Sequence, residues 1–438
     1  MSSPRRRVVI TGLGIISPLG NSPAALWDAL TAAKSGVAAC DGAAGSDVPL
    51  PFAARCRDFA GKIDDVGPLP AARKKAIRKA LKVMCRETQM AVAAAQLALA
   101  DAGLGEEVPD PERSGVVLGS DYMLTMPEDY VRGIQKCASD DDFQFNRWGN
   151  EGLAEMTPLW MLKYLPNMPA SHIAILNDLR GPNNSLTMRE ASSNLAVAEA
   201  MRTIRRGHAD RMIAGDTGTR ILPMQALHAL QTEQMADGNL PPEQASRPFD
   251  KNRIGMVAGE GAGMVVLEEL AAAQARGATI YAELLGAGSS NVADEQLRGR
   301  TTKALAGAIS ATLDDAQHTP ADIGHINAHG LATTECDAAE AGAINEALDP
   351  RGAEIPVTAL KSSFGNLGAG GGMVELVGGV LALRNGSLPR VLNYESADAR
   401  CGINVAAENS IAAGNTCIKL NVTPQGQAAA VMIGVPPA

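Results

Sequence analysis

Aromatic side chains are scarce in this sequence: they make up 3% of its 438 residues, whereas 46% of the residues are hydrophobic. The interior must therefore be built from Ala, Val, Ile, Leu and Met, and the 45 glycines allow elements to approach closely. A chain of this length is too long for one small core, so we expect two domain-sized halves or one large duplicated fold. This composition is typical of a compact α/β enzyme.

The sequence also lacks paired cysteines and long apolar runs. Its seven cysteines form no CxxC pair and no cluster with histidine, which argues against a structural zinc site and favours reduced thiols in a cytosolic protein. The apolar run after Arg5 to Arg7 is interrupted by two glycines and a threonine, so it does not resemble a signal peptide. The longest later run, 373–383, is much shorter than the roughly 20 residues of a membrane span. We expect a cytoplasmic protein with no membrane span, no metal and no other cofactor.

Acidic residues are absent between Asp65 and Glu87, although the net charge of the chain is −9. The negative net charge disfavours a nucleic-acid partner. The acid-free stretch is compatible with a helix, and it is either a solvated helix face or a docking surface for an acidic partner. Its basic residues are Arg73, Lys74, Lys75, Arg78, Lys79, Lys82 and Arg86.

Hydrophobic periodicity predicts strands that alternate with helices. We expect a buried strand at 7–13, a helix at 26–33, and a long helix from Arg73 to Ala102 that ends at Gly103. Further strands are expected at 115–119, 172–176, 211–215 and 262–267. This alternation favours βαβ units and a mostly parallel sheet.

Two segments of the chain echo each other. In the first, Ser185 to Met188 leads through a tight turn into a buried helix that ends at Gly207. In the second, Val357 to Leu360 leads through a turn into a helix that ends at Gly386. The preceding strands at 8–14 and 282–288 also correspond. We therefore predict two fused copies of one fold, with halves at 1–270 and 271–438 and an insertion at 121–165.

Several motifs occur in the order found in one enzyme family. They include Val8-Val-Ile-Thr-Gly-Leu-Gly, Gly207-His-Ala-Asp-Arg-Met-Ile-Ala-Gly, Ser246-Arg-Pro-Phe-Asp-Lys and Asn327-Ala-His-Gly. Over nearly its whole length the chain resembles the elongating β-ketoacyl-acyl-carrier-protein synthases (ketosynthases) of type II fatty acid and polyketide synthesis. This resemblance implies the α/β thiolase fold, a duplicated five-layer αβαβα arrangement, and a dimer.

The resemblance assigns roles to single residues, and the nucleophile is the main departure. Glu190 stands where the family has the Cys that accepts an acyl chain from a carrier protein. His329 matches the first histidine of the family and Lys361 matches its lysine, with Glu340 at the position that usually pairs with that lysine. Asn366 stands at the position of the second histidine.

A carboxylate cannot store an acyl group as a thiolate does, because a mixed anhydride is less stable than a thioester. The charge state of Glu190 decides which other chemistry is open. If ionised, with the helix N-terminus and Arg189 supporting the charge, Glu190 acts as a general base while His329 and Asn366 polarise a thioester carbonyl. If burial keeps it neutral, Glu190 protonates the carbanion left by malonyl decarboxylation.

Two functions therefore stay open. The first is a non-condensing acid/base enzyme, a decarboxylase, acyl transferase or hydrolase of carrier-bound thioesters, with its site at Glu190, His329, Asn366 and Lys361. The second is a catalytically silent subunit, similar to the chain-length factors and scaffold partners of polyketide systems, in which Glu190 caps its helix and pairs with Arg189. Ordinary condensation ranks third.

The resemblance also implies partners and a substrate gate. Acyl carrier proteins are acidic, and ketosynthases place Arg and Lys on the same early helix, which implies carrier-protein docking at Arg73, Lys74, Lys75 and Arg78. The chain is expected to form a homodimer, or a heterodimer with a Cys-bearing ketosynthase. Gln425 stands where the family has a gatekeeper Phe, so we expect it at the entrance to the substrate site.

Overall fold

A computed structural model describes residues 5–43, 46–139 and 142–437. Within these residues, eleven strands form one mixed sheet with the order β11-β10-β9-β12-β13-β8-β1-β7-β6-β4-β5, and β2 pairs with β3 separately. The strands are β1 Val8–Ile16, β2 Val37–Ala39, β3 Phe52–Ala54, β4 Ser114–Ser120, β5 Asn183–Thr187, β6 Arg211–Thr219, β7 Glu260–Glu269, β8 Ala282–Asn291, β9 His325–Asn327, β10 Pro356–Thr358, β11 Asn404–Val405, β12 Thr416–Val422 and β13 Gln427–Gly434. The helices are α1 Pro23–Thr31, α2 Ala71–Ala80, α3 Arg86–Asp101, α4 Pro127–Cys137, α5 Phe145–Arg147, α6 Trp160–Tyr164, α7 Met168–Asn177, α8 Ser192–Arg205, α9 Pro223–Thr232, α10 Leu270–Ala275, α11 Thr301–Ala316, α12 Thr334–Ala347, α13 Lys361–Phe364 and α14 Gly371–Asn385.

The chain repeats one topology. The sheet runs β5-β4-β6-β7-β1 in the first half and β10-β9-β12-β13-β8 in the second. Without the separate pair β2–β3 and the two-residue edge strand β11, both halves place their third, second, fourth, fifth and first strands side by side. β1 and β8 pair antiparallel, with Val8 opposite Leu284, and join the halves into one sheet. The predicted duplicated α/β architecture is confirmed. The residues at which each half and the insertion at 121–165 begin and end stay predictions.

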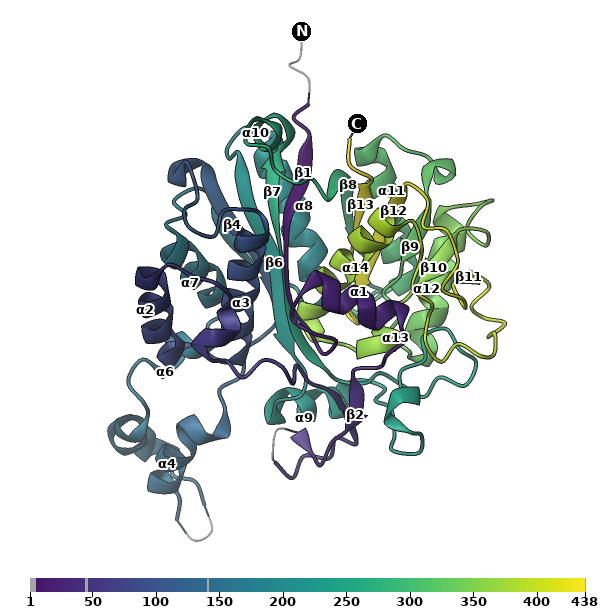
Figure 1. Cartoon of the computed structure of the whole chain (residues 1–438). Coiled ribbons are helices and arrows are strands. Elements are labelled where there is room, and N and C mark those ends of the chain that lie inside the picture. Colours follow the sequence, from purple (N-terminus) through teal and green to yellow (C-terminus); the bar gives the residue numbers. More distant parts are fainter. Residues whose placement is uncertain (1–4, 44–45, 140–141, 438) are drawn as a thin grey trace.

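Helices and sheet stand in layers side by side in Figure 1, with α8 and α14 at the centre. The central helices α8 and α14 pack between the two halves of the sheet in one buried cluster that includes Met201, Val377 and Val431. α3 and α7 cover the outer face of the first half, and α11 and α12 cover the outer face of the second. Both faces of the sheet are therefore buried, which accounts for the aliphatic composition of the interior.

The N-terminal ends of α8 and α14 meet, and this contact positions the site. A side chain at Gly372 would place its Cβ 2.5 Å from Ser193 Oγ, so only glycine fits where α14 approaches α8. Asp216 of β6 accepts a hydrogen bond from the backbone N–H of Met373 at 2.9 Å, which satisfies a donor in the first turn of α14. The turns before the two helices therefore lie against each other.

Three sequence predictions are wrong. The sheet is mixed and not mostly parallel, because β1, β7, β8 and β13, in the middle of the sheet, pair antiparallel with both of their neighbours. Residues 172–176 belong to helix α7 and not to a strand: Pro169 favours a helix start, and a short apolar run alone does not distinguish a strand from a buried helix. The long helix expected from Arg73 to Ala102 is two helices, α2 and α3, because the backbone is extended at Met84 and Cys85. Among the described residues, none of the helices is both long and apolar enough to cross a bilayer.

Leu376→Ala should lower the free energy of unfolding by about 2–5 kcal/mol, because Leu376 of α14 is fully buried and its truncation leaves a cavity. Leu297→Ala removes the same atoms from a side chain that is 84% exposed, and should change stability by less than about 0.5 kcal/mol. Denaturant unfolding of both variants measures these two changes in the free energy of unfolding. Equal effects would contradict the central position of α14.

Candidate active site

Glu190 lies in the turn between β5 and α8. The turn is a 3-10 segment, Arg189–Ala191, and Arg189 has a positive φ of 51° that redirects the chain from strand to helix. The Glu190 side chain is 2% exposed. The chain thus buries a carboxylate directly before the first turn of α8.

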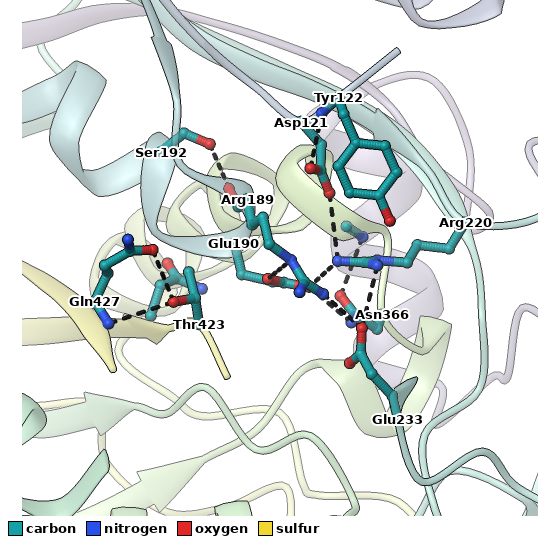
Figure 2. A network of polar contacts seen from close by, with 12 residues as sticks. Asp121, Tyr122, Arg189, Glu190, Ser192, Arg220, Glu233, Asn366, Thr423 and Gln427 are labelled. Carbon is teal, nitrogen blue, oxygen red and sulfur yellow. Dashed lines mark hydrogen bonds and ion pairs between the residues drawn. The ribbon is translucent and has the colours of Figure 1, made fainter. Parts of the chain in front are cut away.

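Three side chains hold the Glu190 carboxylate (Figure 2). Arg220 Nη2 donates to Oε1 at 2.5 Å, and Asn366 Nδ2 donates to the same oxygen at 3.2 Å. Arg189 Nε lies 3.4 Å from Oε2. The carboxylate is therefore clamped by two guanidinium groups and one amide, the amide coming from the second half of the chain.

Arg220, which follows β6, is the centre of this polar network. Its side chain is 1% exposed, and its guanidinium also contacts Glu233 at 3.2 Å and Asp121 at 3.4 Å. Arg189 Nη2 lies 2.5 Å from Glu233. Two guanidinium groups thus share three carboxylates, those of Glu190, Glu233 and Asp121. Arg220 and Glu233 could not be predicted as site residues, because no local sequence pattern links them to Glu190, which lies 30 positions before Arg220.

The ion pairs set the charge of Glu190. Burial raises the pKa of its carboxyl group, but the positive charges of Arg220 and Arg189 outweigh burial and hold the pKa below the usual range. Glu190 is therefore ionised at neutral pH. At the edge of the network, burial raises the pKa of Asp121 to about 6, against the lowering effect of Arg220.

The ring of His329, which follows β9, is oriented by two donors. The Lys361 ammonium lies 3.4 Å from Nδ1, and Asn421 Nδ2 lies 3.5 Å from the same atom. Because both groups are donors, we assign Nδ1 as an acceptor and the ring proton to Nε2. Burial and the charge of Lys361 lower the pKa of His329 well below its usual value, so the ring is neutral at pH 7.

Lys361 pairs with a different acid from the one expected. Its ammonium contacts Glu375 of α14 and donates to His329 O at 2.8 Å. Glu340 instead accepts hydrogen bonds from the backbone N–H groups of His329 at 2.6 Å and Gly330 at 2.8 Å. The expected Lys361–Glu340 pair is wrong, because the backbone turn after β9 uses both oxygens of Glu340. Glu340 supports the His329 turn directly.

A cavity of about 650 Å³ opens beside Glu190 and His329. Its walls come from the segment after α9, the start of α11, the start of α12 and the end of β12. The other lining residues are Thr232, Glu233, Gln234, Gly299, Arg300, Thr301, Thr302, Lys303, Leu331, Thr333, Glu335, Cys336, Ala339, Val422, Thr423 and Pro424. Glu190 and His329 therefore line one cavity, and the Nε2–H of His329 has no hydrogen-bond partner among the described residues.

Two residues expected at the substrate do not take that position. Gln425 is exposed and does not line the cavity, because the turn after β12 presents Thr423 and Pro424 to it instead. Asn366 also does not line the cavity. Its Nδ2 donates to Glu190 and contacts Met256 Sδ at 3.3 Å, so this amide is not free to polarise a thioester carbonyl.

The basic helix expected to dock a partner is α2. Lys75 and Arg78 are exposed on it. Arg73 donates to two backbone carbonyls of the loop after α3, and Lys74 lies 3.1 Å from Asp64. Of the four expected docking residues, Lys75 and Arg78 are thus the more available, while Arg73 and Lys74 are engaged within the chain.

Comparison with known proteins agrees with this architecture. Residues 5–273 match the family model for the β-ketoacyl synthase N-terminal domain, and residues 281–395 match the model for the C-terminal domain. The 3-oxoacyl-[acyl-carrier-protein] synthase 2 of Coxiella burnetii is 34% identical over 406 residues, which cover 91% of each chain. The ishigamide ketosynthase/chain length factor has a TM-score of 0.79 at 26% identity, and a type II polyketide ketosynthase solved with its acyl-carrier protein has 0.82 at 25%. Each structural match covers 99% of this chain and 100% of the other, so the predicted thiolase-type ketosynthase fold is confirmed.

Glu190→Gln should lower the free energy of unfolding by about 3 kcal/mol at pH 7, because two buried guanidinium groups lose a charge partner. The folded-state pKa of Glu190 lies below the unfolded value of about 4.5, so the advantage of the wild type is complete above roughly pH 5 and declines as the pH falls through the folded pKa. Denaturant unfolding at several pH values checks this.

Glu335→Gln is the matched control for that measurement, because the Glu335 side chain is 88% exposed. It should show neither the stability loss nor the pH dependence. A wild-type advantage over Glu190→Gln that is the same at pH 3 and pH 7 would contradict an ionised Glu190 with a lowered pKa.

Proposed function

Because this chain belongs to the β-ketoacyl synthase family, we propose that it is a non-condensing, chain-length-factor-like subunit that works beside a Cys-bearing ketosynthase in type II fatty acid or polyketide synthesis. The observation that carries the proposal is the buried ion pair between Glu190 and Arg220. By the family resemblance, this turn is the one that would carry the nucleophile of a condensing enzyme.

Glu190 is unsuited to nucleophilic catalysis. Attack on a thioester would form a mixed anhydride, which is less stable than the thioester it replaces. The same step would remove the negative charge that lies between Arg189 and Arg220, and would leave these buried cations with less compensation. Both effects oppose an acyl-enzyme at this position.

Glu190 is also a poor acid and a poor base. Since its pKa is held below the usual range, it carries no proton at neutral pH to give to a carbanion, and its affinity for a proton is too low for efficient base catalysis. Its charge would also repel a malonyl carboxylate entering the same cavity. The acid/base role considered for Glu190 is therefore weaker than a structural one.

A partner that supplies the missing nucleophile fits the comparisons. The ishigamide structure pairs a ketosynthase with a chain length factor, and the hexaketide-bound structure contains a type II acyl-carrier protein. By analogy, we propose that this chain pairs with a Cys-bearing ketosynthase in the cytoplasm and that a carrier protein delivers the substrates of the pair. A homodimer is the alternative.

A second candidate function is supported by His329. The neutral ring has Nε2–H available to a cavity of about 650 Å³, where a donor of this kind stabilises an oxyanion. Decarboxylation of a malonyl thioester would release CO2 and leave an enolate that takes its proton from water, and hydrolysis would use water as the nucleophile. Neither reaction needs an acyl-enzyme or a proton from Glu190.

The purified chain alone should leave malonyl- and acyl-carrier protein unchanged in a mass-spectrometric assay. Together with the Cys-bearing ketosynthase that copurifies with it, the chain should support condensation, because the partner supplies the thiol. His329→Gln and Glu190→Ala separate the candidates: thioester loss with the chain alone that disappears in His329→Gln and persists in Glu190→Ala would favour the second function. Condensation by the chain alone would contradict both.

Arg78→Glu should weaken the binding of an acidic carrier protein about tenfold at low salt, with a smaller difference at high salt, because an exposed charge contact is screened. Binding measured at two ionic strengths checks this. Arg206→Glu, at an exposed arginine after α8, is the matched control and should leave affinity unchanged. Equal affinity of the Arg78 variant and the wild type would reject docking at α2.

A further inference from the structure

Lys419 is a buried lysine without a role in the site described so far. It lies in β12, its side chain is 0% exposed, and its ammonium is 2.6 Å from Glu375 Oε2. It also donates to the backbone carbonyl of Leu420. The other oxygen of Glu375 contacts Lys361. One carboxylate therefore lies between two ammonium groups, and we refer to Lys361, Glu375 and Lys419 as the lysine–glutamate triad.

With both lysines protonated, the triad carries one more positive charge than negative charge; burial lowers the pKa of Lys419, and the charge of Glu375 opposes that lowering. Its three side chains are at most 2% exposed, so water does not compensate the excess. Burial of an ion is costly, and an apolar residue at position 419 would still leave Glu375 paired with Lys361. Stability alone does not account for the second ammonium group, which points to an effect on a neighbouring side chain.

That neighbour is His329. Charges of both signs act on the protonation of this ring. The Glu190 carboxylate favours the protonated imidazolium, whereas the ammonium groups of Lys361 and Lys419 disfavour it. Polar groups near the ring come from several elements. These groups are Lys361 from α13, Glu375 from α14, Lys419 and Asn421 from β12, Glu340 from α12, and Arg189 and Glu190 from the turn before α8.

We propose that Lys419 is a positioning residue which, through Glu375 and Lys361, keeps Nδ1 of His329 unprotonated and leaves its Nε2–H available to the cavity. Glu375 is held from both sides and keeps the Lys361 ammonium against Nδ1. The excess positive charge offsets the carboxylate of Glu190 on the other side of the ring. This inference goes beyond the proposed function and applies equally to a silent subunit and to a hydrolase.

His325, earlier in β9, offers an internal reference for the test. It is also buried, and its Nδ1 lies 2.7 Å from the carbonyl oxygen of Ala413. A carbonyl only accepts, so the neutral ring of His325 carries its proton on Nδ1. The two buried histidines therefore have opposite tautomers, which the ¹⁵N chemical shifts of the ring nitrogens distinguish.

The experiment is a pH titration of the full chain with ¹⁵N-labelled histidine, in which only six residues give ring signals. His329→Gln identifies the His329 signals. Lys419→Met removes the ammonium and keeps an unbranched side chain, and Lys419→Gln retains a donor for Leu420 O if the Met variant does not fold. Lys251→Met removes an exposed lysine and is the matched control.

At pH 7 the wild-type ring of His329 should be neutral with its proton on Nε2. In Lys419→Met the pKa of His329 should rise by about one unit or more, because a buried positive charge is lost. In a Glu190→Gln background the pKa of His329 should start lower, because the anion that favours protonation is absent, and Lys419→Met should still raise it. Lys251→Met should leave the titration unchanged. An unchanged His329 titration in both folded Lys419 variants, or a wild-type proton on Nδ1, would overturn the proposal.

Discussion

The contact between the Glu190 carboxylate and the Arg220 guanidinium constrains the rest of the site. Both side chains are almost fully buried, so each needs the other to compensate its charge. Arg220 in turn draws Glu233 and Asp121 into the network. Since Asn366 donates to the same Glu190 oxygen, the turn before α14 is tied to the turn before α8. The two halves of the molecule are thus joined here by polar contacts as well as by apolar packing.

Much of the architecture could be predicted because the pattern of strand, turn and buried helix occurs twice in the sequence. The matching strand order of the two halves is its structural counterpart. Prediction failed where local patterns are ambiguous: the apolar run at 172–176 suits a buried helix as well as a strand, and nothing in the periodicity between Arg73 and Ala102 marked the extended backbone at Met84. These are differences that tertiary packing decides.

The candidate site was predictable where motifs mark turns. Glu190, His329 and Lys361 occur in such motifs, and they do lie around one region. The partners of these residues were harder to predict, since an acid within a helix gives no sign of which lysine it will meet. Glu375 rather than Glu340 faces Lys361 because α14 runs through the centre of the fold, while Glu340 on α12 is taken up by backbone donors.

The sharing of Glu190 between two arginines also bears on how such a chain changes over generations. A lone substitution from Glu to Cys at 190 would take from Arg220 the nearest of its three carboxylate partners, in an interior where water does not replace it. Loss of Arg220 first would instead remove the nearest cation from the Glu190 carboxylate. Either order passes through a less stable intermediate, so we expect Glu190 and Arg220 to be exchanged for other residues only together.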